Sequence, residues 1–203
     1  MKTLKETKDF ISSNLKIDFN YYQNDNYLGV VLEKKSDLLT LIKFLKNDEQ
    51  LLFEQLIDIT AIDYPSRKLR FDVVYIILSL VLNQRILIKI SIGRDEVLES
   101  ISSIHSSSNW YERECYDLFG IKFINHPDLR RIMTDYNFEG HPLRKDFPLT
   151  GHNEVHYDEL EKKVVYDKVK LSQEYRDFDY SSPWEGIENQ LIGDEKAKKD
   201  NSR

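Results

Sequence analysis

Two apolar segments that follow each other along the chain do most to restrict its fold. Residues 69–82 are apolar and β-branched, and toward their end both faces of a strand would be apolar, which is typical of a central strand. After Asn83 and Gln84, residues 85–92 place isoleucine at every second position, which is the period of a β-strand. We therefore expect these segments to pair as neighbouring strands in the middle of a sheet.

The segments before this pair predict further strands and two helices. Residues 5–15 place apolar side chains on one face of a short helix. Residues 17–22 and 27–33 are rich in strand-forming residues, and the four polar residues between them tolerate the backbone conformations of a hairpin turn. Ser36 is a good N-cap for a second helix, whose apolar residues repeat at helical spacing: Leu38, Leu41, Ile42 and Leu45.

Three shorter segments complete the pattern up to residue 109. Residues 51–56 predict a helical turn or two, and residues 57–64 alternate like a strand that Pro65 ends. The serine-rich residues 100–108 predict another short helix. Together the elements define an α+β fold: a mostly antiparallel sheet of four or five strands with packed helices, followed by a long irregular C-terminal extension.

The extension begins at residue 126 in this interpretation. We expect residues 1–125 to form the core domain and residues 126–203 to form an arm and tail that dock on partner proteins, with disorder from about residue 193. Residues 154–166 predict a late strand or extended arm within it. Beyond Leu171 the regular patterns end, yet four aromatic residues follow: Tyr175, Phe178, Tyr180 and Trp184. Aromatic side chains without a sheet to cover them favour contact with another protein.

Charge and cysteine content exclude several classes of function. The 203-residue chain has a net charge of −6, whereas a nucleic-acid-binding protein would normally present a basic face. It has one cysteine, too few for a disulfide framework or a site with four cysteine ligands. The first ten residues lack the apolar stretch of a signal peptide, and the longest apolar run, Val73–Leu82, is far shorter than the roughly 20 residues that cross a bilayer. We therefore expect any membrane association to occur through partners.

The segment from Trp110 to Gly151 is dense in paired charges and aromatic residues. Its beginning predicts a helix, with Asn109 and Glu112 as a capping box and Gly120 as the stop. An inward stripe would contain Cys115 as a small core residue, while Trp110, Glu114 and Asp117 would share the neighbouring stripe. A short strand is expected next, at residues 121–123, and the prolines and glycines that follow exclude any long regular element.

These charged residues admit two main interpretations. Arg130, Arg131, Arg144 and Lys145 lie beside aromatic residues, which is the composition of many protein interfaces. Alternatively, the same cations pair with the acidic helix inside the chain, and both interpretations can hold for different residues. Arg113 stands four residues before Asp117 and is predicted to pair with it.

Other chemistry has weaker support. Glu114 and Asp117 lie three residues apart on one helix face, as an acid–base pair would, but no nucleophile or cofactor motif accompanies them. His152 and His156 frame a segment that superficially resembles a zinc-protease motif, but Glu154 stands two residues after His152 instead of directly after it. The dipeptides that begin at His126 and His141 predict tight bends, with proline fixing the backbone and imidazole capping nearby backbone groups.

Three blocks of this sequence resemble one protein family. Glu112-Arg113-Glu114, Asp117-Leu118-Phe119, His126, Arg130, Ile132 and Met133 have the spacing found in the C subunit of the proton-pumping NADH:quinone oxidoreductase, respiratory complex I. Residues 138–151 resemble the second block of the same family, and residues 178–186 resemble the tail of its mitochondrial and alphaproteobacterial members. The resemblance covers most of the chain, from about Leu38 to Gly186.

The resemblance implies a scaffold protein of the hydrophilic arm, on the cytoplasmic face of the bacterial inner membrane. In that family electrons pass from NADH through FMN and iron–sulfur clusters to quinone in neighbouring subunits, and the complex translocates protons. The C subunit itself has no cofactor and no catalytic or metal-binding residues, and it packs chiefly against the quinone-reducing D subunit. We expect this interface to involve Trp110, Glu112, Arg113, Glu114, Asp117, His126, Arg130, Arg131, His141, Arg144, Lys145, Phe178 and Trp184.

Two alternatives stay open. The same signature occurs in a component of membrane-bound hydrogenases, although the tail block and the length favour the respiratory protein. A free-standing metal-dependent hydrolase that uses Glu114, Asp117 and His126 is the alternative from another class. Charge reversal at Arg130 and Arg144 is expected to dissociate the assembly and leave the domain folded.

Overall fold

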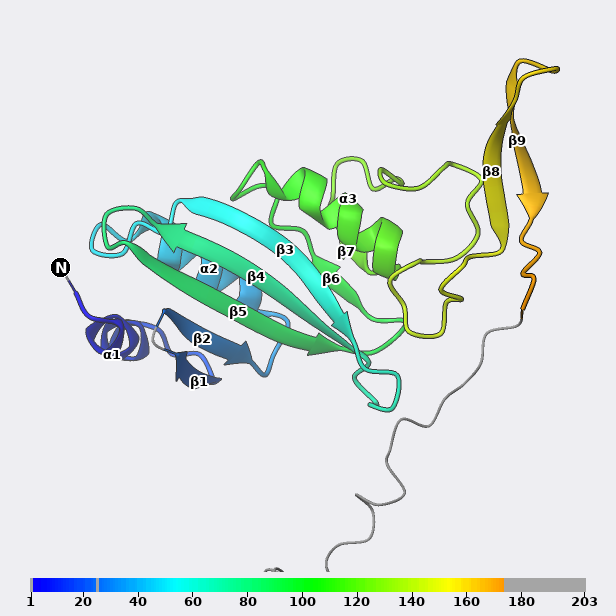
Figure 1. The fold of residues 1–203 in the computed structure, drawn as a ribbon. Coiled ribbons are helices and arrows are strands. Elements are labelled where there is room, and N and C mark those ends of the chain that lie inside the picture. Colours follow the sequence, from blue (N-terminus) through cyan, green and yellow to red (C-terminus); the bar gives the residue numbers. More distant parts are fainter. Residues whose placement is uncertain (1, 25, 174–203) are drawn as a thin grey trace, which may run out of the picture. The chain divides into compact units, whose positions relative to one another are not determined.

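The computed structural model describes residues 2–24 and 26–173, and within them the expected α+β fold is confirmed (Figure 1). The chain begins with α1 (Leu4–Asn14), the hairpin β1 (Phe19–Asn24) and β2 (Tyr27–Leu32), and α2 (Asp37–Asn47). Three nine-residue strands follow: β3 (Gln55–Asp63), β4 (Phe71–Ser79) and β5 (Gln84–Ile92). After them come β6 (Val97–Glu99), α3 (Ser108–Phe119), β7 (Lys122–Ile124), β8 (Asn153–Asp158) and β9 (Lys163–Lys168).

The main sheet has five strands in the order β1-β2-β5-β4-β3. Three of its four pairings are antiparallel, and β2 pairs with β5 in parallel. The predicted pairing of the two apolar segments is confirmed, because β4 and β5 run antiparallel from Phe71 opposite Ile92 to Ser79 opposite Gln84. Isoleucines 86, 88, 90 and 92 are all buried on one face of β5, as their spacing predicts.

Helix α2 supplies much of the core. Its four predicted core residues, Leu38, Leu41, Ile42 and Leu45, are fully buried, and the helix lies behind the sheet in Figure 1. Ser36 is the N-cap residue by position, but its side chain makes no capping hydrogen bond. The predicted helical turns at residues 51–56 are wrong: Leu52 has a positive φ of 45°, which a right-handed helix cannot continue through, and Phe53 is a core residue.

Two further units accompany the main sheet. Strands β6 and β7 pair in parallel, with α3 as the connection between them. The predicted short helix at residues 100–108 is wrong, since this segment forms turns up to residue 107 and α3 begins at Ser108. In the second compact unit, which begins at Asn153, β8 and β9 form an antiparallel hairpin. The expected strand conformation at residues 154–166 is thus confirmed, but as two strands joined by a turn and not as one strand or arm.

Residues 126–152 have no regular secondary structure and belong to the first compact unit, Met1–His152. The division into a core and a docking arm at residue 125 stays a prediction about which segments contact partners. Phe178, Trp184, the block at residues 178–186 and the expected disorder from about residue 193 lie outside the described residues. None of the helices in the described ranges is both long and apolar enough to span a bilayer.

Candidate interface around helix α3

Helix α3 ends where its sequence predicts. Gly120 is the C-cap residue with a positive φ of 76°, and its N–H bonds to the Tyr116 carbonyl oxygen, which is a common way for a helix to stop. Its start differs from the prediction: the N-cap position is Ser107, without a side-chain capping bond. The expected capping box of Asn109 and Glu112 is therefore wrong.

The Glu112 side chain points into the protein and has no solvent exposure. Its carboxylate accepts hydrogen bonds from the Ser100 hydroxyl at 2.6 Å and from the Ile101 backbone N–H at 2.7 Å. Burial raises the pKa of Glu112 to about 7, although these hydrogen bonds act to lower it. Glu112 therefore holds the turn before α3 against the helix.

Asp117 is the most heavily bonded side chain of the segment and is also fully buried. One carboxylate oxygen accepts three successive backbone N–H groups, from Ile132 at 3.0 Å, Met133 at 2.7 Å and Thr134 at 2.8 Å. The other accepts the Arg131 guanidinium at 2.7 Å and the Thr134 hydroxyl at 2.5 Å. Burial alone would raise the pKa of Asp117, but the bonds from Thr134, Ile132 and Arg131 outweigh burial and lower the pKa to about 2.

Arg113 does not pair with Asp117, so that prediction is wrong. Its guanidinium lies 5.4 Å from the Trp110 ring and donates to the backbone carbonyl oxygens of Arg130 and Arg131, both at 3.1 Å. Arg113 and Asp117 thus hold the same turn, residues 130–134, from two positions on α3. For Arg131, the alternative of pairing within the chain is the one that the structure bears out.

The block at residues 141–144 closes the other end of the helix. The last carbonyl oxygens of a helix have no partners within the helix, and here three successive ones are occupied. His141 Nδ1 donates to the Asp117 carbonyl at 2.8 Å, the Leu143 N–H to Leu118 at 3.0 Å, and Arg144 Nε to Phe119 at 2.5 Å. The two motif blocks are therefore one structure, in which the second block caps the helix that the first block forms.

Arg70, just before β4, connects residues 145 and 146 to the end of β3. Arg70 binds Asp63 through two hydrogen bonds, at 2.6 and 2.8 Å, and also binds Asp146 at 2.9 Å. Asp63 accepts in addition the Lys145 backbone N–H at 2.7 Å. The bonds from Arg70 are the main reason that the pKa of Asp63 is lowered. Sequence spacing offers no sign of this network, because its members lie 7 to 82 residues apart.

The histidines behave as predicted, as caps of backbone groups. His126 Nδ1 accepts the Asp128 N–H at 3.1 Å, and Nε2 lies 3.1 Å from the Asn109 carbonyl oxygen. Burial is the main cause of the lowered pKa of His141, and the neighbouring Arg144 and Arg131 add to it. Cys115 is a buried core residue, as predicted, and its thiol donates to the Ile59 carbonyl oxygen at 3.2 Å.

The residues of the hydrolase hypothesis do not share a site in the described part of the chain. The Asp117 carboxylate is occupied by its five donors, and His126 is engaged with backbone groups near the start of α3. His156 lies in the exposed strand β8, 3.6 Å from Asp167. Residues 2–24 and 26–173 contain no group of three or more His, Cys, Asp or Glu side chains placed to hold a metal ion.

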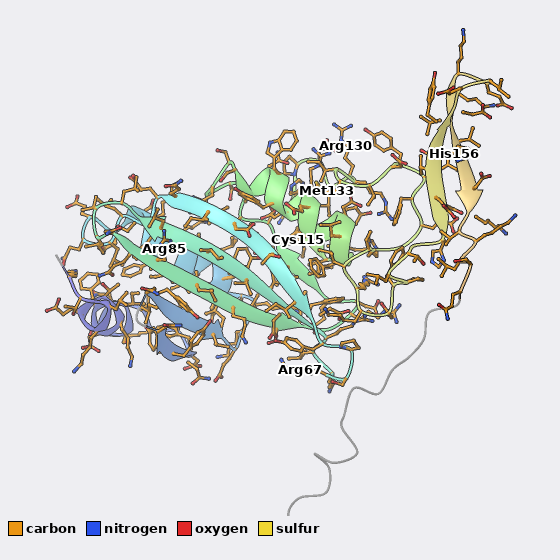
Figure 2. All side chains as sticks on the ribbon, viewed as in Figure 1. Arg67, Arg85, Cys115, Arg130, Met133 and His156 are labelled. Atoms are coloured by element: carbon orange, nitrogen blue, oxygen red, sulfur yellow. The ribbon has the colours of Figure 1, made fainter. Side chains whose placement is uncertain are left out.

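The outward-facing residues of this region form what we call the α3 surface: Trp110, Arg130, Met133 and Tyr136. Trp110 is 62% exposed, Met133 64% and Tyr136 79%. Arg130 is exposed and pairs with Asp128 at 2.8 Å, and Figure 2 shows it with Met133 beside α3, while Cys115 lies between α3 and the sheet. Met133 and Tyr136 were not among the predicted interface residues. Glu114 and Lys145 also reach the surface, whereas Glu112, Asp117 and Arg131 are engaged inside the chain.

Comparison with solved structures defines the class of fold. The chain is similar to one chain in the structure of the membrane-bound sulfane sulfur reductase, an archaeal respiratory membrane complex, with a TM-score of 0.59 and 19% sequence identity. The match covers 71% of this chain and 85% of that one. At this identity the likeness concerns the fold alone: an α+β domain of a type that occurs in a respiratory membrane complex.

Sequence comparison gives the family itself. The family described as "Respiratory-chain NADH dehydrogenase, 30 Kd subunit" matches residues 31–153. The NADH-quinone oxidoreductase C subunit of Cereibacter sphaeroides is 58% identical over 161 residues, which cover 79% of this chain and 80% of that protein. The corresponding C subunit of a Jannaschia species is 51% identical over 196 residues, covering 96% and 94%. The chain therefore belongs to the family of C subunits of the NADH-quinone oxidoreductases, as its motifs predicted.

Proposed function

We propose that the chain is a structural component of an NADH-quinone oxidoreductase and that it carries no cofactor of its own. In this proposal NADH, FMN, the iron–sulfur clusters and quinone are bound by neighbouring subunits, and the chain fixes their relative positions in the hydrophilic arm. It reaches the cytoplasmic face of the membrane only through the complex. Its single cysteine supports this assignment, because an iron–sulfur cluster needs several protein ligands.

The observation that carries the proposal is that some side chains around α3 are bonded inside the chain while others face solvent. The buried Asp117 and the partly buried Arg131 and Arg113 fix the turn at residues 130–134. Fixing that turn presents Arg130 and Met133 to solvent beside the exposed Trp110. Tryptophan, tyrosine, arginine and methionine are enriched at interfaces, and a rigid surface loses less entropy on binding than a mobile one. We propose that the α3 surface contacts the quinone-reducing D subunit.

The test combines Trp110→Ala with Arg130→Glu in the full chain, expressed in a bacterium from which the gene for its own C subunit has been deleted. Truncating a central interface residue typically costs about 2 kcal/mol or more, so we expect the double variant to co-purify poorly with the other subunits and to lower NADH:quinone reductase activity. Arg85→Glu is the control, since Arg85 is exposed near the start of β5, away from α3 (Figure 2). Normal assembly and activity of the double variant would contradict the proposal.

Arg130 is a better target than Arg144 for this test. Arg144 bonds to the Phe119 carbonyl oxygen at the end of α3, so its replacement also removes a helix cap. A loss of assembly in such a variant could then result from a loss of folding. The unfolding transition of the purified double variant, compared with that of the unaltered chain, reports whether the domain itself is intact.

The membrane-bound hydrogenase component is the alternative within the same class. The identity of 58% to the C subunit of an NADH-quinone oxidoreductase supports the quinone reductase assignment. The genes beside this one distinguish the two, because a hydrogenase operon encodes a metal-containing hydrogenase subunit.

A further inference from the structure

Two hollows adjoin each other on the β6–β7 side of α3. The first, which we call the cationic hollow, has a volume of about 270 Å³ and is lined by Arg94, Asp95, Glu96, Gly120, Lys122, His141 and Arg144. The second, the apolar hollow, has a volume of about 360 Å³ and is lined by Val97, Tyr116, Lys122, Phe123, Ile124 and Leu129. Lys122 lines both, so the two hollows are neighbours, and we refer to them together as the groove.

Arg144 is the half-buried charge of the cationic hollow. Its Nε donates to the Phe119 carbonyl oxygen, and its guanidinium carbon lies 5.4 Å from the Phe71 ring. It makes no ion pair with any carboxylate in the described part of the chain. Burial and the nearby charges of Arg70 and Arg94 lower the pKa of Arg144. A guanidinium has five N–H donors, so Arg144 is held in place and still has N–H groups that can donate to a ligand.

The acidic residues of the lining do not balance its cations. Glu96 is already paired with Lys35 at 3.3 Å and accepts the Gly93 N–H at 3.1 Å. Among the lining residues this leaves Asp95 opposite Arg94, Lys122 and Arg144. Arg94 and Lys122 are exposed and have no ion pair in the ranges that the structure describes. A carboxylate is the complement of such a site, because arginine can bind it through two hydrogen bonds.

The apolar hollow favours a different group. Ile124 is 52% exposed and Val97 37% exposed, and both lie on strands of the two-stranded β6–β7 sheet. A free anion would fill only the cationic hollow and leave these side chains in water. An extended peptide presents different side chains to successive pockets, so it can fill both hollows at once.

The geometry points to a docking groove for an extended segment of a neighbouring protein of the complex. That segment places an Asp or Glu side chain in the cationic hollow and an apolar side chain in the apolar hollow. The inference rests on the proposed function, because it assumes that the chain is assembled with other subunits. It adds a contact distinct from the α3 surface, with a stated chemistry for the partner.

The first test reverses charge in the groove with Arg94→Glu and Lys122→Glu together, in the full chain within the complex. Both side chains are exposed and unpaired within the described residues, so the fold is expected to survive. The matched control, Arg85→Glu with Lys43→Glu, changes the net charge equally at two other exposed positions. We expect the groove variant to co-purify about tenfold less than the control at moderate salt, because two repulsive contacts replace two attractive ones. Equal recovery of both variants would overturn the inference.

The second test identifies the occupant. A photo-cross-linking amino acid at Ile124 of the otherwise unaltered chain, in the purified complex, is expected to capture a peptide of another subunit with an acidic residue within a few positions of an apolar one. A cross-link to residues 174–203 of the same chain, to a second copy, or to a peptide without an acidic residue would overturn the inference, as would no cross-link. If the proposed function itself fails, the unaltered chain will not co-purify with the complex, which separates the two failures.

Discussion

Replacing Asp117 by asparagine tests whether this side chain organises the region. The substitution keeps the size of the side chain and removes its charge. An asparagine has one oxygen for the five donors that the carboxylate now accepts, and its amide would direct N–H groups at other N–H groups. Removing one partner of a buried ion pair typically costs about 3–5 kcal/mol. Arg131 keeps its bond to the Gly140 carbonyl oxygen and retains some exposure, so we expect about 3 kcal/mol, near the lower end of that range.

Thermal and urea unfolding of the purified chain measure this loss. For a chain of this length 1 kcal/mol corresponds to a change in Tm of about 2–4 °C, so the expected fall in Tm is about 10 °C. Hydrogen exchange locates the effect: the amides of Ile132, Met133 and Thr134 should lose protection, while those of β4 and β5 keep theirs. Glu114→Gln is the control, because it removes the same charge from the same helix at a side chain without a hydrogen bond or ion pair in the described residues.

Acid gives an independent check on the same residue. The pKa of Asp117 is lowered from 3.8 to about 2, so its contribution to stability is present above the unfolded-state value and is lost as the pH falls through about 2. The difference between the unaltered chain and Asp117→Asn should therefore shrink on acidification. Equal unfolding midpoints at neutral pH, or loss of protection spread evenly over the sheet, would refute the idea that Asp117 pins this turn.

The same region and the tail that follows it give three further predictions. The pKa of Glu112 is raised from 4.5 to about 7, so the folded state holds this proton more tightly than the unfolded state, and the chain should lose on the order of 3 kcal/mol of stability as the pH rises between these values. Glu112→Gln should remove that pH dependence in urea unfolding, and an unchanged slope would contradict it. Gly120→Ala should destabilise the chain by about 2 kcal/mol, because φ is positive and the added carbon would lie 2.3 Å from an Arg144 nitrogen; Gly93→Ala, where the nearest atom is 3.4 Å away, should have a much smaller effect in the same assay. Deleting everything after Leu171 should leave a folded domain that no longer co-purifies with the complex, and normal co-purification would show that the tail aromatics are dispensable.

The sequence predicts those elements whose determinants are local. Alternating isoleucines in β5, the helical spacing of Leu38, Leu41, Ile42 and Leu45, and the stop at Gly120 all depend on residues within one element, and the structure confirms them. The parallel pairing of β2 with β5 was not predicted, because strand pattern does not specify which distant strand lies alongside. The bulge between Leu56 and Asp58 was missed for the same reason.

The charged residues of α3 show why site prediction is harder than element prediction. Spacing along a helix suggested Asn109 as the partner of Glu112 and Arg113 as the partner of Asp117. The true partners of Asp117 lie 14 to 17 residues away and those of Glu112 lie 11 to 12 residues away. Helical spacing gives the face on which a side chain lies, but not which segment covers that face. The family resemblance pointed to the segment that contains these residues, yet it did not separate inward-facing residues from outward-facing ones.

The division between inward-facing and outward-facing residues explains why residues 126–152 form a defined surface although they have no regular secondary structure. A loop ordinarily gains little from its own contacts, and it loses conformational entropy when it is fixed. Here the N–H groups of residues 132–134 bond to Asp117, and residues 141, 143 and 144 bond to the last carbonyl oxygens of α3. The helix and the loop thus satisfy polar groups that each would otherwise leave open. Because most of this bonding uses backbone atoms and buried side chains, Trp110, Met133 and Tyr136 remain available for a partner, and substitutions there should weaken assembly without unfolding the chain.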